Sequence, residues 1–272
     1  MRLNPFAKKG TVIPVVPISG GIGMAAPLRS GVSASGLEQQ LARAFAMKSP
    51  AVALRINSPG GSAVQSHLIF KRIRALAAEK KKAVIVGVGG VAASGGYMIA
   101  LAGDEIVVDP SSIVGSIGVV FAGFGFPRLI DKLGIDRRVH TAGQSKVILD
   151  PFQPEKPEDV ARLKQLQREV HESFIAMVRA RRPRLADDPD LFTGAFWSGE
   201  RAVALGLVDR IGDLHAVLRE KYGEDVTLKV MSAEKGLLRR RLGLAAPLSA
   251  ESIAEAALGT IEERLLWNRY GL

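Results

Sequence analysis

The amino-acid sequence predicts an α/β fold built around a mostly parallel β-sheet. Apolar strand-like segments alternate with amphipathic helical segments along most of the chain, and this order produces parallel strands joined by right-handed crossovers. The strand-like segments show little alternation of apolar and polar residues, as expected for strands buried on both faces. With 272 residues, 47% of them hydrophobic and 24% charged, the chain can form one large core.

Each expected strand is a short apolar run that ends at glycine, proline or polar turn residues. In chain order these strands are Thr11–Ser19, Ala51–Ile56, Ala83–Val88, Glu105–Val108 and Val226–Val230. We expect the last of them at an edge of the sheet. The segment from Ile113 to Phe121 is also apolar, with glycines within it.

Each expected helix has apolar residues that recur at helical spacing. These helices are Gly36–Met47, Val64–Glu79, Ser94–Ala102 and Pro157–Arg182. The composition changes after Val230, and a further amphipathic pattern covers Glu251–Trp267. We therefore expect a main domain of repeated ββα or βαβ units over residues 1–234. A basic linker and a C-terminal amphipathic helix follow over residues 235–272.

The C-terminal helix has two interpretations. Its apolar stripe favours packing on its own domain or on a neighbouring subunit. The stripe consists of Ile253, Ala257, Ile261 and Leu265. The alternative is a helix that lies in a membrane interface. Glu262 and Glu263 weigh against that alternative, because interfacial helices favour Lys and Arg.

Two uncharged stretches resemble membrane segments. Ala83–Gly103 is long enough to cross a bilayer, but six glycines interrupt it, so we expect a strand, a turn and a helix. Gly10–Leu28 follows basic residues, as in a signal peptide. Pro14 and Pro17 interrupt its short apolar part, so we expect a first β-strand. On this interpretation the chain carries no transmembrane helix of its own.

The formal net charge of +10 allows contact with anionic lipid, nucleic acid or an acidic partner. Most positive residues are dispersed. The clusters are Arg179, Arg181, Arg182 and Arg184, followed by Arg239, Arg240 and Arg241. Aromatic residues make up 6% of the chain, without a stacking motif for single strands, so no nucleic-acid partner is expected. We interpret the charge as a solvated basic face near acidic lipid.

The chain has no cysteine. This excludes disulfides, thiolate catalysis and Cys-ligated metals. The absence fits either side of a bacterial inner membrane.

Ser94 lies in a glycine-rich turn between an apolar strand and a helix, in the sequence Ala93-Ser94-Gly95-Gly96. A serine at such a turn can expose its hydroxyl, and small neighbours let a substrate backbone approach. The helix N-terminus also offers free N–H groups to a developing oxyanion. The alternative is a serine that only caps the helix.

A second glycine-rich turn, Asn57–Gly61, also follows a buried strand. The carboxyl ends of parallel strands share one edge of a sheet, so both turns can face the same crevice. The N–H groups of Gly61 and Gly95 could then form an oxyanion hole. The alternative for Asn57–Gly61 is an ordinary Pro-Gly turn.

Activation of Ser94 requires a base, and His67 is the best placed of the four histidines, early in the helix after Gly61. It has no evident acidic partner for a triad. Lysine is the other option. Lys146 precedes an apolar run in an expected loop, where burial would depress its pKa as a base requires. The alternative is an exposed loop lysine.

At this point the sequence resembles the SppA-type signal peptide peptidases, which share the Clp-protease/crotonase fold. The resemblance extends from about Val12 to Gly212. It rests on Asn57–Gly61, Ala93–Tyr97, Gly115–Val119, Lys146, Trp197–Glu200, Ala204–Asp209 and Ile211–Gly212.

The resemblance implies a serine endopeptidase with a Ser/Lys dyad. Ser94 is the implied nucleophile and Lys146 the general base, while Ser116 orients the lysine amine. Gly61 and Gly95 are the implied oxyanion donors. The resemblance also implies released signal peptides and other apolar unstructured segments as substrates, no metal or organic cofactor, and a ring-like homo-oligomer whose subunits help to line the groove. We expect the protein at the periphery of a bacterial inner membrane or in the cytoplasm.

Two other functions fit the same fold. A crotonase-type acyl-CoA enzyme would use the oxyanion hole without a serine nucleophile. It would need catalytic carboxylates, and the candidates Asp104 and Asp109 form no recognisable pair. A catalytically silent membrane scaffold that binds peptides is the second alternative.

Overall fold

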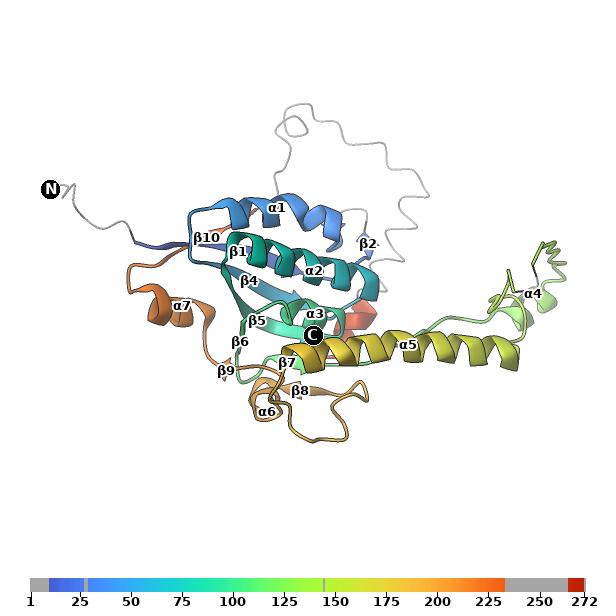
Figure 1. The fold of residues 1–272 in the computed structure, drawn as a ribbon. Coiled ribbons are helices and arrows are strands. Elements are labelled where there is room, and N and C mark those ends of the chain that lie inside the picture. The colour runs from blue at the N-terminus through green and yellow to red at the C-terminus, as the bar shows by residue number, and fades with distance from the viewer. Residues whose placement is uncertain (1–9, 27–28, 144, 233–263, 272) are drawn as a thin grey trace, which may run out of the picture. The chain divides into compact units, whose positions relative to one another are not determined.

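The computed structural model describes residues 10–26, 29–143, 145–232 and 264–271. The chain divides into two compact units (Figure 1). The sheet unit comprises Met1–Ile117 and Met177–Leu272, and the inserted unit comprises Gly118–Ala176.

An eight-stranded sheet forms the centre of the sheet unit. Its strands are β1 (Val12–Ser19), β4 (Ala51–Ser58), β5 (Ala83–Ala93), β6 (Glu105–Val108), β7 (Ile113–Gly115), β8 (Phe196–Ser198), β9 (Arg210–Ile211) and β10 (Thr227–Val230). The order is β10-β1-β4-β5-β6-β9, and β7 pairs with both β5 and β8. All pairs are parallel except β7 with β8. The predicted fold class is therefore confirmed, with β10 at an edge.

Helices cover both faces of this sheet. The helices of the sheet unit are α1 (Ala34–Ala46), α2 (Ala63–Lys80), α3 (Gly95–Ala100), α6 (Gly199–Ala204) and α7 (Leu214–Tyr222). Helices α1 and α2 lie together on one face, and α7 packs on the opposite face (Figure 1). Side-chain oxygens of Ser33, Ser62 and Asp213 accept N–H groups in the first turns of α1, α2 and α7, which explains why these helices begin there.

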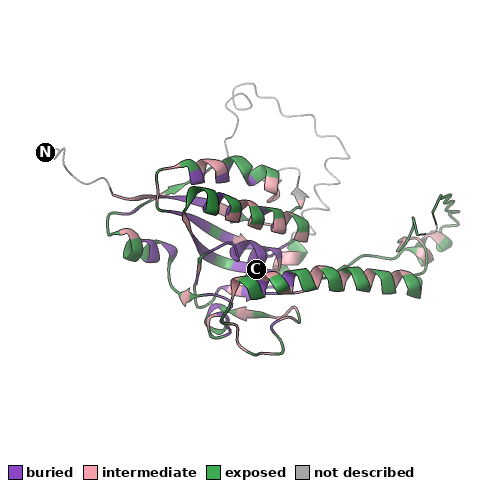
Figure 2. Cartoon of the chain, in the orientation of Figure 1, coloured by how far each residue is buried: buried purple, intermediate pink, exposed green. Residues whose placement is uncertain are grey.

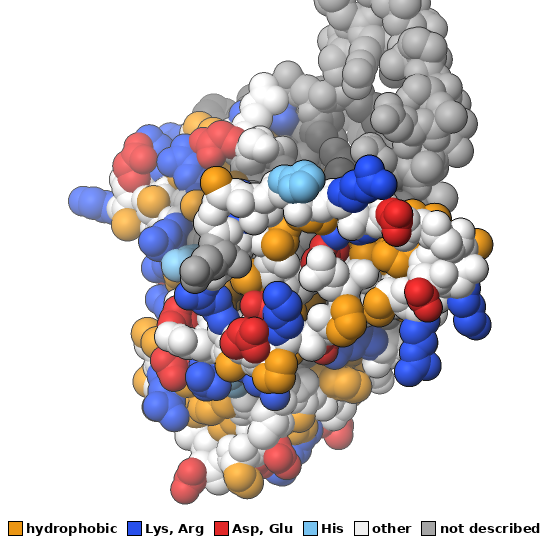
Figure 3. Space-filling model, turned by 90° about the vertical axis from the view of Figure 1, so that its right-hand side faces the viewer, with side chains coloured by type: hydrophobic (Ala, Val, Ile, Leu, Met, Phe, Trp, Pro, Cys, Tyr) orange, Lys and Arg blue, Asp and Glu red, His pale blue; other side chains and the backbone are white. Residues whose placement is uncertain are grey.

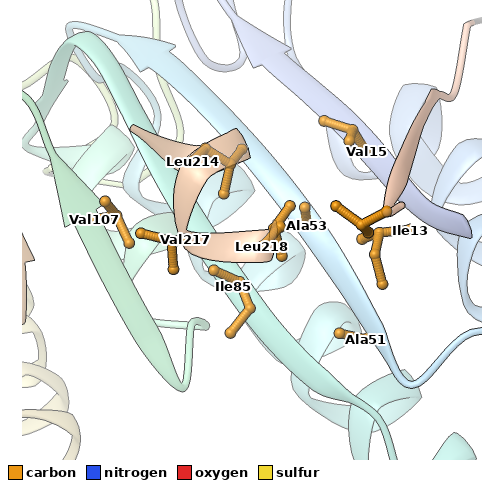
Figure 4. Packing of buried hydrophobic residues seen from close by; sticks show 10 residues of the cluster. Ile13, Val15, Ala51, Ala53, Ile85, Val107, Leu214, Val217 and Leu218 are labelled. Atoms are coloured by element: carbon orange, nitrogen blue, oxygen red, sulfur yellow. The ribbon is translucent and has the colours of Figure 1, made fainter. Parts of the chain in front are cut away.

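The core under α7 consists of aliphatic side chains from the sheet and the helix (Figure 4). Its buried members are Ile13, Val15, Ala51, Ala53, Ile85, Val107, Leu214, Val217, Leu218 and Val226. Burying one large aliphatic side chain contributes about 1.5–3 kcal/mol. Gly87 lies under α7, and a Cβ there would come within 2.8 Å of Leu214 Cβ. The helix therefore approaches the sheet closely.

Strand β5 continues to Ala93, so the expected end at Val88 is wrong. The pairing with β4 shifts in register between Ile56 and Ser58, and exposed glycines of β5 lie at the shift. The side chain of Asn57 accepts the N–H of Val91 at 3.1 Å, replacing a missing ladder bond. Two adjacent glycines suggest a turn from sequence, but here they form a bulge inside a strand.

Both stretches that resemble membrane segments belong to the sheet unit. The proline-containing part of Gly10–Leu28 forms β1, and Ala83–Gly103 forms β5 and α3, as predicted. Among the helices that the structure describes, none combines the length and apolarity needed to cross a bilayer.

Two arginines of the first basic cluster are largely withdrawn from solvent, so the interpretation as a solvated basic face is wrong for these two. Arg182 makes two 2.9 Å bonds to the carboxylate of Asp209 and a third to the carbonyl of Gly206. Arg181 donates to the carbonyls of Leu101 and Gly103. Both therefore tie the end of α5 (Pro157–Arg181) and the residue after it to the sheet unit.

The expected C-terminal helix falls mostly outside the described residues. Residues 264–268 are helical, in agreement with its predicted end. The basic linker and the second basic cluster, Arg239–Arg241, lie outside the described residues. The domain boundary at residue 234 therefore stays a prediction.

The inserted unit contains α4 (Pro127–Lys132) and most of α5. Among its described residues only Phe174 is buried (Figure 2). A small local cluster joins Phe126 and Phe152, with ring centroids 5.8 Å apart, and an ion pair links Arg137 to Asp150. Many large hydrophobic side chains are exposed, among them Phe124 at 80%.

Candidate active site

Ser94 lies between the end of β5 and the first residue of α3. Its φ of 51° and ψ of −121° place it where residues other than glycine are strained by about 1–3 kcal/mol. Its N–H donates to the carbonyl of Gly115 at 2.8 Å, and its own carbonyl accepts the N–H of Met98. Backbone bonds on both sides thus hold the strained conformation, and such strain gathers at functional sites.

The hydroxyl of Ser94 does not cap α3, although the residue occupies the capping position. This removes the capping interpretation, because a capping serine accepts an N–H of the first turn. The side chain is half-buried. The strained backbone therefore presents a hydroxyl with no structural use in the helix, as a nucleophile requires.

Glycines around Ser94 are required by close approach of the surrounding segments. A Cβ at Gly95 would lie 2.3 Å from Ser66 Oγ, and one at Gly96 would lie 2.6 Å from the carbonyl of Ser58. A Cβ at Gly60 would lie 2.8 Å from Ser94 Cβ and 3.0 Å from the nitrogen of Gly95. The two glycine-rich turns are therefore in contact, as predicted.

The turn Asn57–Gly61 is held from both sides. The carbonyl of Gly60 accepts the N–H of Ile22 at 2.8 Å, and Ser58 Oγ accepts the N–H of Gly60 while donating to the carbonyl of Gly20. Gly61 has a φ of 137°, and a Cβ there would lie 2.2 Å from the carbonyl oxygen of Ile22. Only glycine fits this position.

The N–H groups of Gly61 and Gly95 have no acceptor among the residues that the structure describes. Gly61 is exposed and Gly95 opens α3. Two unused donors beside one serine hydroxyl suit an oxyanion that forms during acyl transfer. Ile22 and Ser58 bond the residues on either side of Gly61 instead, since Gly60 bonds to both of them and Ser62 donates to the carbonyl of Ile22.

Ser116 follows Gly115, which is the acceptor of the Ser94 N–H. It is 8% exposed, has a φ of 53° and donates its N–H to the carbonyl of Ala195 at 2.7 Å. Ser94 is thus hydrogen-bonded to the peptide group that joins Gly115 to Ser116, a second serine with a strained backbone. The sheet unit brings together Ser94, Ser116, Gly61 and Gly95.

Lys146 belongs to the inserted unit. Its side chain is exposed there, and its N–H donates to the carbonyl of Gly143 at 3.2 Å. Its role as the base of Ser94 stays a prediction.

His67, the best placed histidine, forms no triad within the described part of the chain. His67 lies on α2 with its ring 6.4 Å from that of Phe70, without a carboxylate partner in that part. Burial, and less strongly the charge of Lys71, lowers the pKa of His67 from its ordinary value of 6.5. His140 and His215 are exposed.

The carboxylates that a crotonase-type reaction would use have structural roles. Asp104 binds Arg74 and accepts the N–H of Val84, and Asp109 accepts the N–H of Ser111 in a turn. Both carboxylates thus take part in local structure. The described residues include no cluster of side chains that could hold a metal ion.

Sequence analysis missed Ser66, and it named Asn57 and Ser58 only as members of a glycine-rich turn, without a supporting role. Asn57, Ser58 and Ser66 hold the glycine turns through the contacts described above. Their signal is weak in a sequence, because a serine beside glycines is typical of any polar turn. Only burial distinguishes the two serines, since Ser58 and Ser66 are fully buried.

Comparison with known proteins identifies the family of the chain. The model of peptidase family S49 matches residues 76–227, which is more than half of the chain, and the Clp protease model matches residues 19–112. A putative protease of Synechocystis, slr0021, is 33% identical over 225 residues, covering 79% of this chain and 80% of that protein.

The Na(+)/H(+) antiporter NhaA of Brucella melitensis is 54% identical over 284 aligned residues. The match covers all of this chain but only 39% of the antiporter, so the chain spans well under half of that relative.

A solved structure has the same fold. It is a lysine-to-alanine mutant of the 1510-N membrane-bound stomatin-specific protease in complex with a substrate peptide. Its TM-score is 0.53 at 16% identity, and the match covers 92% of this chain and 99% of that one. The likeness confirms the predicted Clp-protease type of fold. Taken with the family model and the Synechocystis relative, it leads to one assignment: the chain belongs to peptidase family S49, the family of serine peptidases that the resemblance predicted.

Proposed function

We propose that this chain is a serine endopeptidase with Ser94 as its nucleophile and Lys146 as its general base. The observation that supports this most is the strained Ser94, whose hydroxyl is not used by the helix that it begins. Membership of a peptidase family supports the reaction class. The dyad itself rests on the resemblance of the motifs around Ser94, Ser116 and Lys146.

In the proposed reaction the Oγ of Ser94 attacks the carbonyl carbon of a peptide bond while its proton passes to the neutral amine of Lys146. The N–H groups of Gly61 and Gly95 bind the oxyanion. The lysine then gives the proton to the leaving amine, and the acyl-enzyme forms. Water, deprotonated by the same amine, attacks the ester, and the amine returns that proton to Ser94 Oγ as the second product leaves. Ser116 orients the lysine amine.

We propose released signal peptides and other apolar, unstructured segments as substrates. An extended backbone could approach Ser94 because its side chain is only half-buried and Gly61 in the adjacent turn is exposed. The similarity to part of a protein named as an antiporter, and the fold shared with a protease named as membrane-bound, support action close to a membrane.

We further propose that the protein works as a homo-oligomer. The inserted unit supports this, because it exposes many large hydrophobic side chains and buries only one described residue. The most exposed are Val120 (67%), Phe121 (58%), Phe124 (80%) and Leu133 (63%). Figure 3 shows one face of the molecule on which hydrophobic side chains lie at the surface among charged ones. Surfaces of this kind are usually covered by another protein.

Oligomerisation would also help Lys146 to act as the general base. A lysine must be desolvated or placed beside another cation before it can accept a proton near neutral pH. Lys146 is exposed in the inserted unit, as are Val147 and Ile148 next to it. A second copy that covers these residues would supply the burial that a single chain lacks.

The test of the proposed function combines labelling and cleavage. A fluorophosphonate should label the wild-type chain, and Ser94→Ala should abolish both labelling and cleavage of an apolar reporter peptide. Lys146→Ala should lose cleavage while it remains folded. Labelling that persists in Ser94→Ala would refute the nucleophile, and full cleavage by Lys146→Ala at neutral pH would refute the base.

A further inference from the structure

An apolar patch lies on one face of the sheet, next to the strand end that carries Ser94. Strand β7 pairs Ile113 with Val91 and Gly115 with Ala93, and it pairs Gly115 with Phe196 of β8. Residues paired across strands share a face. We call Val91, Ala93, Ile113 and Phe196 the tip patch.

The tip patch holds a side chain from the C-terminal end of the chain. Tyr270 is only 8% exposed and forms a buried cluster with Val91 and Ala93. Its ring meets Phe196 edge to face, with the centroids 5.1 Å apart. Trp267 packs beside it, and the N–H of Tyr270 donates to the carbonyl of Trp267 at 2.9 Å. An aromatic side chain on a short turn thus fills the patch.

The patch and the nucleophile are parts of the same two strand ends. Ala93 is covalently bonded to Ser94, and the carbonyl of Gly115 accepts the Ser94 N–H at 2.8 Å. Phe196 pairs with that same Gly115. A peptide whose carbonyl carbon lies against Ser94 Oγ would therefore place one of its side chains within reach of the patch.

Tyr270 is attached in a way that permits displacement. Within the described part of the chain, the hydrogen bonds of residues 264–271 run inside that segment. Contact with the sheet is made through Trp267 and Tyr270, whereas Leu265 is 56% exposed. Phe196 stays 47% exposed beneath the bound ring. A segment held by side-chain contacts alone can give way to another aromatic side chain.

We propose that the tip patch is a specificity subsite of the Ser94 site that accepts an aromatic side chain of the substrate, and that Tyr270 occupies it in the free chain. The inference deepens the proposed peptidase function and rests on it for the meaning of substrate. Tyr270 then competes with aromatic residues of incoming peptides. An edge-to-face ring contact with Phe196 supplies the preference for aromatic over small side chains.

Binding tests the subsite without requiring catalysis. The probe is a fluorescein-labelled peptide with the sequence of residues 264–271, and a second probe carries alanine in place of its tyrosine. Both are titrated against the full chain with Ser94→Ala. Adding Tyr270→Ala should tighten the first probe about tenfold if the segment is docked in about nine of ten molecules. The alanine probe should bind more weakly and respond little.

Matched variants separate competition from a general effect on folding. Tyr270→Phe keeps the ring and should bind the probe as the parent does. Leu265→Ala changes an exposed residue of the same segment and should also leave binding unchanged. Phe196→Leu should weaken the tyrosine probe and remove the gain caused by Tyr270→Ala. Equal affinities in all these variants, or a gain that Phe196→Leu does not remove, would overturn the proposal.

Turnover distinguishes failure of the subsite from failure of the proposed function. With Ser94 present, Tyr270→Ala should lower KM for reporter peptides that contain an aromatic residue and leave kcat unchanged. If no reporter is cleaved but the binding differences hold, the peptidase proposal fails and the subsite stands. If cleavage occurs and KM does not depend on residue 270, the subsite is refuted and Tyr270 is only a packing contact.

Discussion

The N–H of Ser94 donates a 2.8 Å hydrogen bond to the carbonyl of Gly115. This bond joins the end of β5 to the end of β7, and the residue after Gly115 is the buried Ser116. Both serines have positive φ, so each strand end turns sharply at its serine. The accepting carbonyl belongs to the peptide group between Gly115 and Ser116. The backbone positions of the two serines are therefore coupled through this hydrogen bond.

Gly95→Ala should inactivate the protein through a specific clash. The added Cβ would lie 2.3 Å from Ser66 Oγ, and we expect a loss of about 1–3 kcal/mol in the free energy of unfolding, with slower labelling of Ser94. Removing the opposing atom in Gly95→Ala with Ser66→Ala should restore part of both, because the pair is coupled. Gly212→Ala, where the nearest atoms lie at 3.5 Å, is the control. Equal loss in the single and double variants would contradict this explanation.

Lys146→Ala should reduce kcat of peptide cleavage by about 10²–10⁴, the usual contribution of a positioned base. Ser116→Ala should reduce it less, because the lysine would stay but lose an orienting partner. The measurement is steady-state cleavage of an apolar reporter peptide at several pH values. Lys156→Ala, an exposed lysine of the same unit, should retain wild-type kcat. A Ser116→Ala variant with an unchanged pH profile would argue against a role beside the lysine.

Arg182→Met should destabilise the fold. Arg182 is 10% exposed and Asp209 30% exposed, and the arginine satisfies both that carboxylate and the carbonyl of Gly206. Loss of a largely buried partner costs about 2–4 kcal/mol, somewhat less than a fully buried pair. Arg184→Met, at an exposed site two residues away, should change the free energy of unfolding by less than about 0.5 kcal/mol. Urea denaturation measures both, and equal effects would restore the solvated-face interpretation.

Acidification should lower the stability of the sheet unit partly through His67. Its folded-state pKa lies below the ordinary value because of burial and Lys71, so the unfolded chain binds more protons as the pH falls through about 6.5. Stability contributed by the neutral ring is therefore complete above that pH and is lost below it. His67→Gln should flatten the dependence of the free energy of unfolding between about pH 7.5 and pH 5.5. The exposed His215→Gln should preserve it, and identical slopes in the two variants would contradict the assignment.

Phe121→Ser combined with Phe124→Ser should reduce the mass of the particle in solution. These side chains are 58% and 80% exposed in the single chain, so replacing them costs little folding energy but removes apolar contact area between copies. Light scattering coupled to gel filtration gives the mass. Leu68→Ser, on the exposed side of α2 and 47% exposed, is the control and should leave the mass unchanged. A wild-type chain that is monomeric at all concentrations would refute the oligomer.

Much of the fold follows from local pattern alone. The predicted strand Glu105–Val108 and the predicted helix from Pro157 agree with the structure almost residue for residue. The spacing of apolar residues along the chain directly reflects the period of each element and the face that it buries. The short strands β8 and β9 escape prediction, because two or three residues carry no measurable period. Strand β5 extends beyond its expected end because Gly89 and Gly90 form a bulge inside a strand and resemble a turn only in sequence.

The sequence by itself determined the family, the parallel α/β fold and the two glycine-rich turns, because each depends on residue types at close spacing. Only the tertiary structure decided that the Ser94 hydroxyl leaves its helix uncapped and that Gly60 packs against Ser94 Cβ. It alone showed that Tyr270 packs against Val91 and Ala93 of the sheet, and Ala93 precedes Ser94. The contacts of Gly60 with Ser94 and of Tyr270 with the sheet join segments far apart in the chain. The close approach of packed elements fixes them, and no local pattern encodes it.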